Sequence, residues 1–176
     1  MKTYISMLRG INVGGNKKVS MEKLKKLYES LGLEKVKTYI QSGNVIFEST
    51  TTKTAELKKK LEEKISQTFG FEVIVIIRTV EEMEKVIDAS PFKEKDENKI
   101  LVTFLSDPPK EIPLQEIEKV KSASEEFSIS GKEIYLFFPD GYGRTKLANN
   151  FFERKLKLAA TTRNWRTINK LWELAQ

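Results

Sequence analysis

The sequence predicts an α+β protein with two ferredoxin-like subdomains and antiparallel sheets. Three observations support this class. Residues 1–78 follow the order strand, helix, strand, strand, helix, strand, which is the split βαβ pattern. A βαββ order begins again at residue 99, and two helices follow it. The chain of 176 residues is 39% hydrophobic, which suffices for a core, and no long linker divides it.

The first half of the first subdomain is marked by alternation and by a capping residue. Residues 2–9 alternate in polarity and are apolar enough for a strand. Ser20 is the expected N-cap of a helix, because apolar residues at helical spacing follow it and Gly32 ends the pattern. Residues 36–47 contain two further strands around the turn Gln41–Asn44.

A long helix and a buried strand complete this subdomain. Residues 52–69 carry an apolar stripe at helical spacing, and Gly70 ends the helix. Residues 71–78 are expected to form a strand, because they contain the continuous β-branched run Val73–Ile77, which is typical of a strand buried on both faces. Residues 79–98 are expected to form a connecting helix and a linker.

The second subdomain, residues 99–176, repeats most of this order. A threonine is expected to cap its last helix. The expected elements are a strand at 100–105, a helix at 114–122, strands at 127–130 and 134–138, and basic helices at 146–156 and 163–174.

The strongest candidate for a binding site is the glycine loop, Arg9–Asn16, directly after the first strand. It holds three glycines, two asparagines and an arginine. Glycines such as Gly14 and Gly15 let backbone N–H groups approach an anion closely, and successive N–H groups can form a concave anion site. An arginine adds a planar fork of donors that matches a phosphate.

The expected strand order places a second polar segment beside this loop. In a sheet of order 4-1-3-2, the end of the first strand and the turn Gln41–Asn44 lie at the same edge. The candidate ligand-binding residues of the first subdomain are therefore Arg9, Asn12, Gly14, Gly15, Gln41, Ser42 and Asn44.

Most of the net charge of +6 belongs to the end of the chain. Residues 139–176 hold eight Lys and Arg against three Asp and Glu. Asn149 and Asn150 fall in the first turn of an expected helix, beside free N–H groups and the positive end of its dipole. Arg163 is expected on the solvent side of the last helix. We therefore add four residues to the candidate site: Arg144, Lys146, Asn150 and Arg163.

Simpler interpretations stay open for each feature. The glycine loop could be only a tight connection, because it matches neither the Gly-x-Gly-x-x-Gly fingerprint nor a P-loop. Ser42 could belong to a plain hairpin turn. Glu153 could be an ordinary ion-pair partner on a helix surface. The lysines at 23, 25 and 26 indicate a solvated helix face balanced by nearby glutamates.

Composition excludes several kinds of chemistry. The chain has no His and no Cys, which removes the commonest catalytic bases, a nucleophilic thiol and most zinc sites. The acids show no spacing for an oxygen cage, so we expect no metal and no cofactor. The longest aliphatic run, Val73–Ile77, is too short to cross a bilayer, and the basic N-terminal region does not resemble a signal peptide. We expect a cytoplasmic protein that does not bind a membrane.

Four motifs in order resemble a bacterial family of conserved proteins classed as a domain of unknown function. They are Leu8–Gly15, Tyr39–Val45, Gly143–Glu153 and Ala160–Thr167. The resemblance extends over the whole chain and implies an α+β protein built from ferredoxin-like subdomains. It implies no activity.

The residues themselves favour a protein that binds an anionic ligand, such as a phosphorylated molecule, a nucleotide or a short RNA. One alternative is an enzyme for a phosphorylated metabolite, with Glu153 or Lys146 as a proton shuttle. Another is an interaction module that docks residues 163–170 onto an acidic protein. If removing the Glu153 or Lys146 side chain abolished turnover without unfolding the protein, the enzyme would be indicated. If deleting or charge-reversing residues 163–170 abolished partner capture but not small-ligand binding, the interaction module would be indicated.

Overall fold

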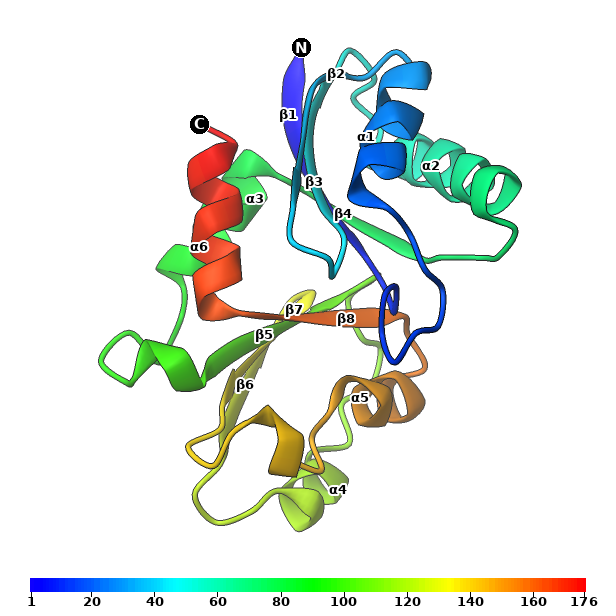
Figure 1. Ribbon diagram of the computed structural model, residues 1–176. Helices are drawn as coiled ribbons and strands as arrows, with labels where there is room; N and C mark the ends of the chain where they lie inside the picture. Colours follow the sequence, from blue (N-terminus) through cyan, green and yellow to red (C-terminus); the bar gives the residue numbers. More distant parts are fainter. The chain divides into compact units, whose positions relative to one another are not determined.

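The computed structural model describes residues 1–176 and confirms a mixed α+β protein with two four-stranded antiparallel sheets and six α-helices (Figure 1). The chain divides into two compact units. The first unit comprises residues 1–85 and 170–176, and the second unit comprises residues 86–169. The sequence analysis ended the first subdomain at residue 78 and assigned the C-terminal residues to the second.

The first unit has the element order βαββαβ followed by a helix. Its sheet has the strand order β2-β3-β1-β4 with every pair antiparallel, which is the order 4-1-3-2 read from the other edge. The elements are β1 (Lys2–Leu8), α1 (Met21–Ser30), β2 (Glu34–Tyr39), β3 (Asn44–Ser49), α2 (Thr54–Phe69), β4 (Val75–Thr79) and α3 (Val80–Asp88).

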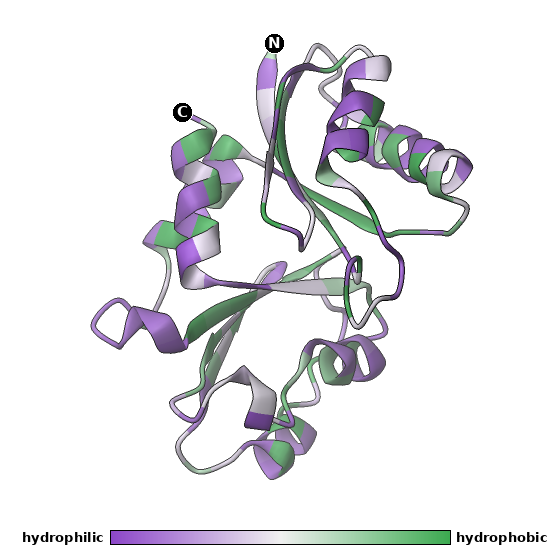
Figure 2. Cartoon of the chain, in the orientation of Figure 1, coloured by the Kyte–Doolittle hydropathy of each residue, from purple (hydrophilic) through white to green (hydrophobic).

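Helices α1 and α2 cover one face of this sheet, and their apolar sides face the strands (Figures 1 and 2). Ser20 caps α1 as predicted, since its hydroxyl accepts a hydrogen bond from the Lys23 N–H. Gly70 ends α2, also as predicted. Three aromatic rings meet in the core, where Phe47 stacks on Tyr4 and meets the edge of Tyr28.

The second unit repeats the same order of elements. Its strand order is β6-β7-β5-β8, again entirely antiparallel. The elements are β5 (Ile100–Leu105), α4 (Leu114–Val120), β6 (Glu126–Ser130), β7 (Glu133–Phe137), α5 (Asn149–Leu156) and β8 (Ala160–Asn164), with short 3-10 turns at Glu97–Lys99 and Tyr142–Arg144. Helix α6 (Trp165–Leu174) follows β8, and its residues from 170 onward group with the first unit.

The strand β8 corrects one detail of the predicted fold. Residues 160–164 were expected to lead into the last helix with a threonine as its cap, so that the second subdomain would be βαββ with two helices. They pair instead with β5, where Thr161 lies opposite Phe104 and Thr162 opposite Thr103. The cap of α6 is Asn164, whose side-chain oxygen accepts from the Thr167 N–H. Threonine suits both a helix cap and a strand, so its presence did not decide between them.

Candidate functional site

The end of β1 and the β2–β3 hairpin meet at one edge of the first sheet, as the strand order predicted. The Leu8 N–H donates to the Gly43 carbonyl over 2.8 Å. Gly43 has a left-handed φ of 86° and is packed so closely that an added Cβ would lie 2.5 Å from the Ile11 side chain. Only glycine fits this position without strain, and the hairpin is thereby held against the start of the glycine loop.

Asn12 joins the two segments through its side chain. Its amide group donates to the Gln41 carbonyl over 2.8 Å and to the Val19 carbonyl over 3.0 Å. Its side-chain oxygen accepts from the Val19 N–H over 2.9 Å. Both amide hydrogens are therefore engaged within the protein. Asn12 was predicted as a ligand contact, and in the structure its side chain joins the glycine loop to Val19 and to the hairpin by hydrogen bonds.

The tip of the glycine loop presents unpaired backbone donors. Val13 and Asn16 form an isolated bridge, and Gly14 and Gly15 turn the chain between them with φ of 57° and 76°. No protein acceptor receives the N–H groups of Gly14 and Gly15. Both residues are exposed, so these two donors are open to a ligand.

An open pocket of about 570 Å³ lies beside this tip, and we call it the glycine-loop pocket. Its walls come from the glycine loop, the start of α1, the β2–β3 hairpin and the end of α2. The lining residues are Asn12, Gly15, Lys18, Val19, Ser20, Lys23, Gln41 and Phe69. They include two lysines and no acid, so the pocket is positively charged at neutral pH.

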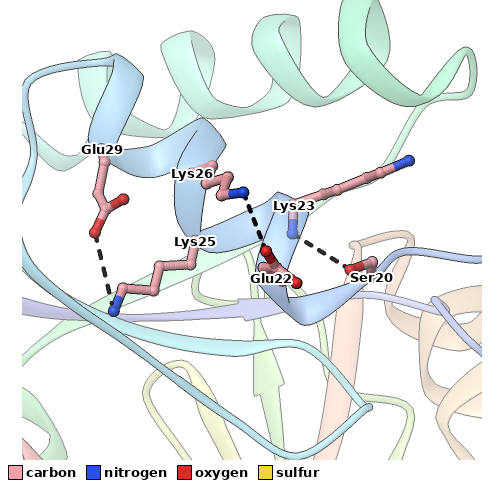
Figure 3. A network of polar contacts seen from close by, with 6 residues as sticks. All are labelled: Ser20, Glu22, Lys23, Lys25, Lys26 and Glu29. Carbon is pink, nitrogen blue, oxygen red and sulfur yellow. Dashed lines mark hydrogen bonds and ion pairs between the residues drawn. The ribbon is translucent and has the colours of Figure 1, made fainter.

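The lysines of α1 differ in their pairing, as Figure 3 shows. Lys25 pairs with Glu29 and Lys26 pairs with Glu22, both one helical turn apart. Lys23 has no carboxylate within ion-pair distance, and its side chain extends away from these pairs. All three lysines were expected on a solvated helix face, whereas the structure places Lys23 in the pocket lining.

Three of the predicted residues of the first unit, Asn12, Gly15 and Gln41, line this pocket, and the others have different surroundings. Asn44 is fully buried, and its amide donates to the Tyr39 carbonyl and to the Ser42 hydroxyl. These contacts stabilise the hairpin. Arg9 and Ser42 are half-buried, and the Arg9 N–H donates to the Ile74 carbonyl.

The predicted residues of the second unit fall into two groups. Arg144, Lys146 and Asn150 are exposed around the start of α5. The prediction that Arg163 faces solvent from a helix was wrong, because Arg163 lies in β8 and only 7% of it is exposed. Its guanidinium donates to the Thr161 hydroxyl over 2.7 Å. Burial lowers the pKa of Arg163 to about 10.

Glu153, considered above as a proton shuttle, is part of the framework of the second unit. Its carboxylate accepts from the Ala160 N–H over 3.1 Å and from the Asn149 amide over 3.3 Å. Asn149 also donates to the Ala160 carbonyl and accepts from the Thr162 hydroxyl. The carboxylate therefore fastens α5 to β8, and this arrangement gives no support to a catalytic role.

Five pocket residues were not predicted as site residues: Lys18, Val19, Ser20, Lys23 and Phe69. Ser20 carried a signal, since a predicted N-cap marks where helix N–H groups begin. Lys18 and Lys23 flank that cap in the sequence. Phe69 was assigned to the buried stripe of its helix, and nothing in its spacing distinguishes it from Ile65.

The structure provides neither a metal centre nor a membrane-spanning helix. No group of three or more acidic side chains is placed to hold a metal ion. No helix has the length and apolar character needed to cross a membrane.

The fold and the pocket thus define a protein with two βαββαβ units and a basic hollow beside a glycine loop. Residues 1–135 match the family model described as "Protein of unknown function (DUF1697)", and the chain belongs to this family. The predicted resemblance is confirmed over these residues.

One solved structure, the conserved bacterial protein SP0830 from Streptococcus pneumoniae, is similar over 99% of each chain, with 28% identity and a TM-score of 0.75. The search of curated proteins gave no match.

Proposed function

We propose that the first unit binds a phosphate-bearing anion in the glycine-loop pocket. The observation that carries this proposal is the charge of the lining, which holds Lys18 and Lys23 but no carboxylate. Neither lysine has an ion-pair partner in the protein. An anion in the pocket would supply the countercharge that the protein itself lacks.

Neutral donors add to this cationic environment. The N–H groups of Gly14 and Gly15 are unpaired at the loop tip. The pocket also includes Ser20, which precedes the first turn of α1, where the helix dipole favours negative charge. Phosphate oxygens accept several hydrogen bonds at once, so this combination of donors and cations suits a phosphate better than a single carboxylate.

The test is a calorimetric or NMR titration with inorganic phosphate, nucleotides and a short single-stranded RNA. We expect saturable binding that weakens as salt rises, most steeply for RNA because counterions are released. The double variant Lys18→Gln/Lys23→Gln should lose at least about tenfold in affinity.

A matched control separates a site from general basicity. Lys25→Gln/Lys26→Gln makes the same change in net charge on the same helix, but it removes lysines that are already paired with Glu29 and Glu22. We expect this control to leave the affinity within about twofold of the unchanged protein. Equal losses in both double variants, or no saturable binding of any probe, would contradict the proposal.

We also propose, as a second part of the same function, that the exposed residues Arg144, Lys146 and Asn150 of the second unit contribute to binding RNA. What supports this is the exposure of Arg144 and Lys146, neither of which has an ion-pair partner. Arg144→Gln/Lys146→Gln should reduce RNA affinity and the salt dependence, with no change for inorganic phosphate. Unchanged RNA binding would restrict the function to the first unit.

A further inference from the structure

The glycine-loop pocket has one aromatic wall, which a site for phosphate alone does not need. Phe69 lines the pocket together with Lys18, Lys23 and Gln41. It is only half-buried, although it continues the apolar stripe of α2, whose preceding members are almost fully buried. The stripe thus extends beyond the core, and its last ring lies at the rim of the pocket.

The Phe69 ring is held in its orientation by a neighbouring aromatic ring. Gly70 ends α2, and the chain turns so that Phe71 stacks on Phe69 with 6.2 Å between the ring centroids and 29° between the planes. Both rings also pack against the core of the first unit. Phe69 is therefore a positioned aromatic surface, held by a neighbouring ring and by the end of its helix.

Another part of the pocket lining offers a side-chain amide that makes no hydrogen bond within the protein. The backbone of Gln41 is fixed because its carbonyl accepts the Asn12 amide over 2.8 Å. The Gln41 side chain is exposed and makes no hydrogen bond within the protein. A primary amide of this kind can donate and accept at once, which suits the edge of a base or the hydroxyls of a ribose.

The volume of the glycine-loop pocket is also that of a small-molecule binding site. A volume of about 570 Å³ lies within the ordinary range for such sites, roughly 300–1,000 Å³. Two cations, the unpaired Gly15 amide, a free side-chain amide and an aromatic ring all line the same pocket. Stacking of bases on aromatic rings contributes substantially to the binding of nucleic acids and is tolerant of base identity.

From these observations we infer that the ligand of the pocket is a nucleotide, with its base on Phe69 and its phosphate beside Lys18, Lys23 and the glycine-loop amides. This inference rests on the proposed function and narrows it to ligands that carry an aromatic base. Gln41 contacts the sugar or the base edge. Base preference is weak, because stacking supplies most of the contact with the base.

The test compares four nucleoside monophosphates with ribose 5-phosphate and inorganic phosphate on the intact chain. We expect each nucleotide to bind at least about tenfold more tightly than ribose 5-phosphate, the amount expected for one stacked base. Phe69→Leu should remove this advantage and leave the affinity for ribose 5-phosphate unchanged. Phe71→Leu, which alters a ring outside the pocket lining, should have a smaller effect on nucleotides than Phe69→Leu.

A second measurement keeps the inference testable if Phe69→Leu does not fold. Phe69→Trp places a fluorescent ring in the same wall, and stacking of a base should quench it, whereas ribose 5-phosphate should not. Equal affinities for nucleotides, ribose 5-phosphate and phosphate in the unchanged protein would overturn the inference and leave the proposed function standing. Absence of binding by every probe would overturn both.

Discussion

The two units share one order of elements and one strand order, yet they differ in where their longest polar connections lie. In the first unit the long connection follows β1 and spans residues 9–20. In the second unit the same position is occupied by residues 106–113, which contain three prolines, and the long connection is instead 138–148, after β7. The framework is repeated, and the loops that carry polar and basic residues are not.

This difference means that the long polar connections of the two units leave their sheets at different points. The connection after β1 leaves the sheet at the edge where the β2–β3 hairpin turns, so two polar segments meet there. The connection after β7 leaves its sheet where β5 begins, since the Phe138 N–H donates to the Lys99 carbonyl over 2.9 Å. The long connection after β7 is therefore not equivalent in position to the glycine loop. The comparison leads to the following predictions, in order of decreasing effect.

The hairpin glycines should differ most clearly between the units. Gly43→Ala should cost about 2–4 kcal/mol of unfolding free energy, because a left-handed φ is combined with a Cβ only 2.5 Å from Ile11. Gly131→Ala, in the β6–β7 turn, should cost about 1 kcal/mol, since its nearest contact is a flexible oxygen of Glu133 at 3.9 Å. Urea denaturation measures the loss of unfolding free energy in each variant. Equal losses would show that the close packing of Gly43 against Ile11 does not add to the cost of its left-handed φ.

Asn12 and Asn149 each join two segments by side-chain hydrogen bonds, and their loss should affect stability in both units but phosphate binding only in the first. Asn12→Ala and Asn149→Ala each remove hydrogen bonds between segments and should cost about 1–3 kcal/mol. Asn12→Ala should also speed amide exchange in residues 10–20 and weaken phosphate binding, because the pocket wall is loosened. Asn149→Ala should leave phosphate binding unchanged. Weaker phosphate binding in both variants would contradict the assignment of the pocket to the first unit.

Alkaline pH should reveal a buried tyrosine in each unit. Burial, followed by the nearby Glu133 carboxylate, raises the pKa of Tyr135 to about 12, and burial raises the pKa of Tyr28 further. The stabilising effect is complete below pH 10, the value for an unfolded tyrosine, and is lost as pH rises from 10 towards the folded pKa. Tyr135→Phe should reduce the loss of stability between pH 9 and 11 in urea denaturation. An unchanged loss would assign the effect to other groups, including Tyr28.

Salt should have the smallest effect, and it should act mainly on the first unit. Helix α1 carries two ion pairs one turn apart and α2 carries three. In the second unit, one pair joins two helices instead, between Lys155 and Glu116. Glu22→Gln should cost about 0.3–0.5 kcal/mol at low salt and almost nothing at 1 M salt. A salt-independent cost would indicate that Glu22 acts through helix capping rather than through Lys26.

Much of the fold could be predicted because alternation, helical spacing and capping residues agree. Ser20 and Gly70 have the roles that their residue types indicate. The meeting of the glycine loop with Gln41 also followed, because strand order alone brings those segments together. The strand β8 was missed because its threonines suit two structures, and the tertiary pairing with β5 decides between them.

The site was harder to predict because it depends on which polar groups the protein itself uses. Asn12 and Asn44 are of a residue type that often contacts ligands. Their side-chain amides instead donate hydrogen bonds within the protein, to Val19 and to Tyr39. Lys23 looks like its neighbours in sequence and differs only in lacking a partner. Hydrogen-bond occupancy depends on side-chain positions, which a single sequence does not contain.

The return of the C-terminus to the first unit has a consequence for synthesis. Residues 170–176 group with residues 1–85, and the Lys37 ammonium donates to the Leu174 carbonyl over 3.2 Å. A ribosome must therefore synthesise residues 170–176 before residues 1–85 acquire these contacts. Removal of residues 170–176 should accordingly disturb the packing of residues 1–85, which are made long before them, rather than that of residues 86–169.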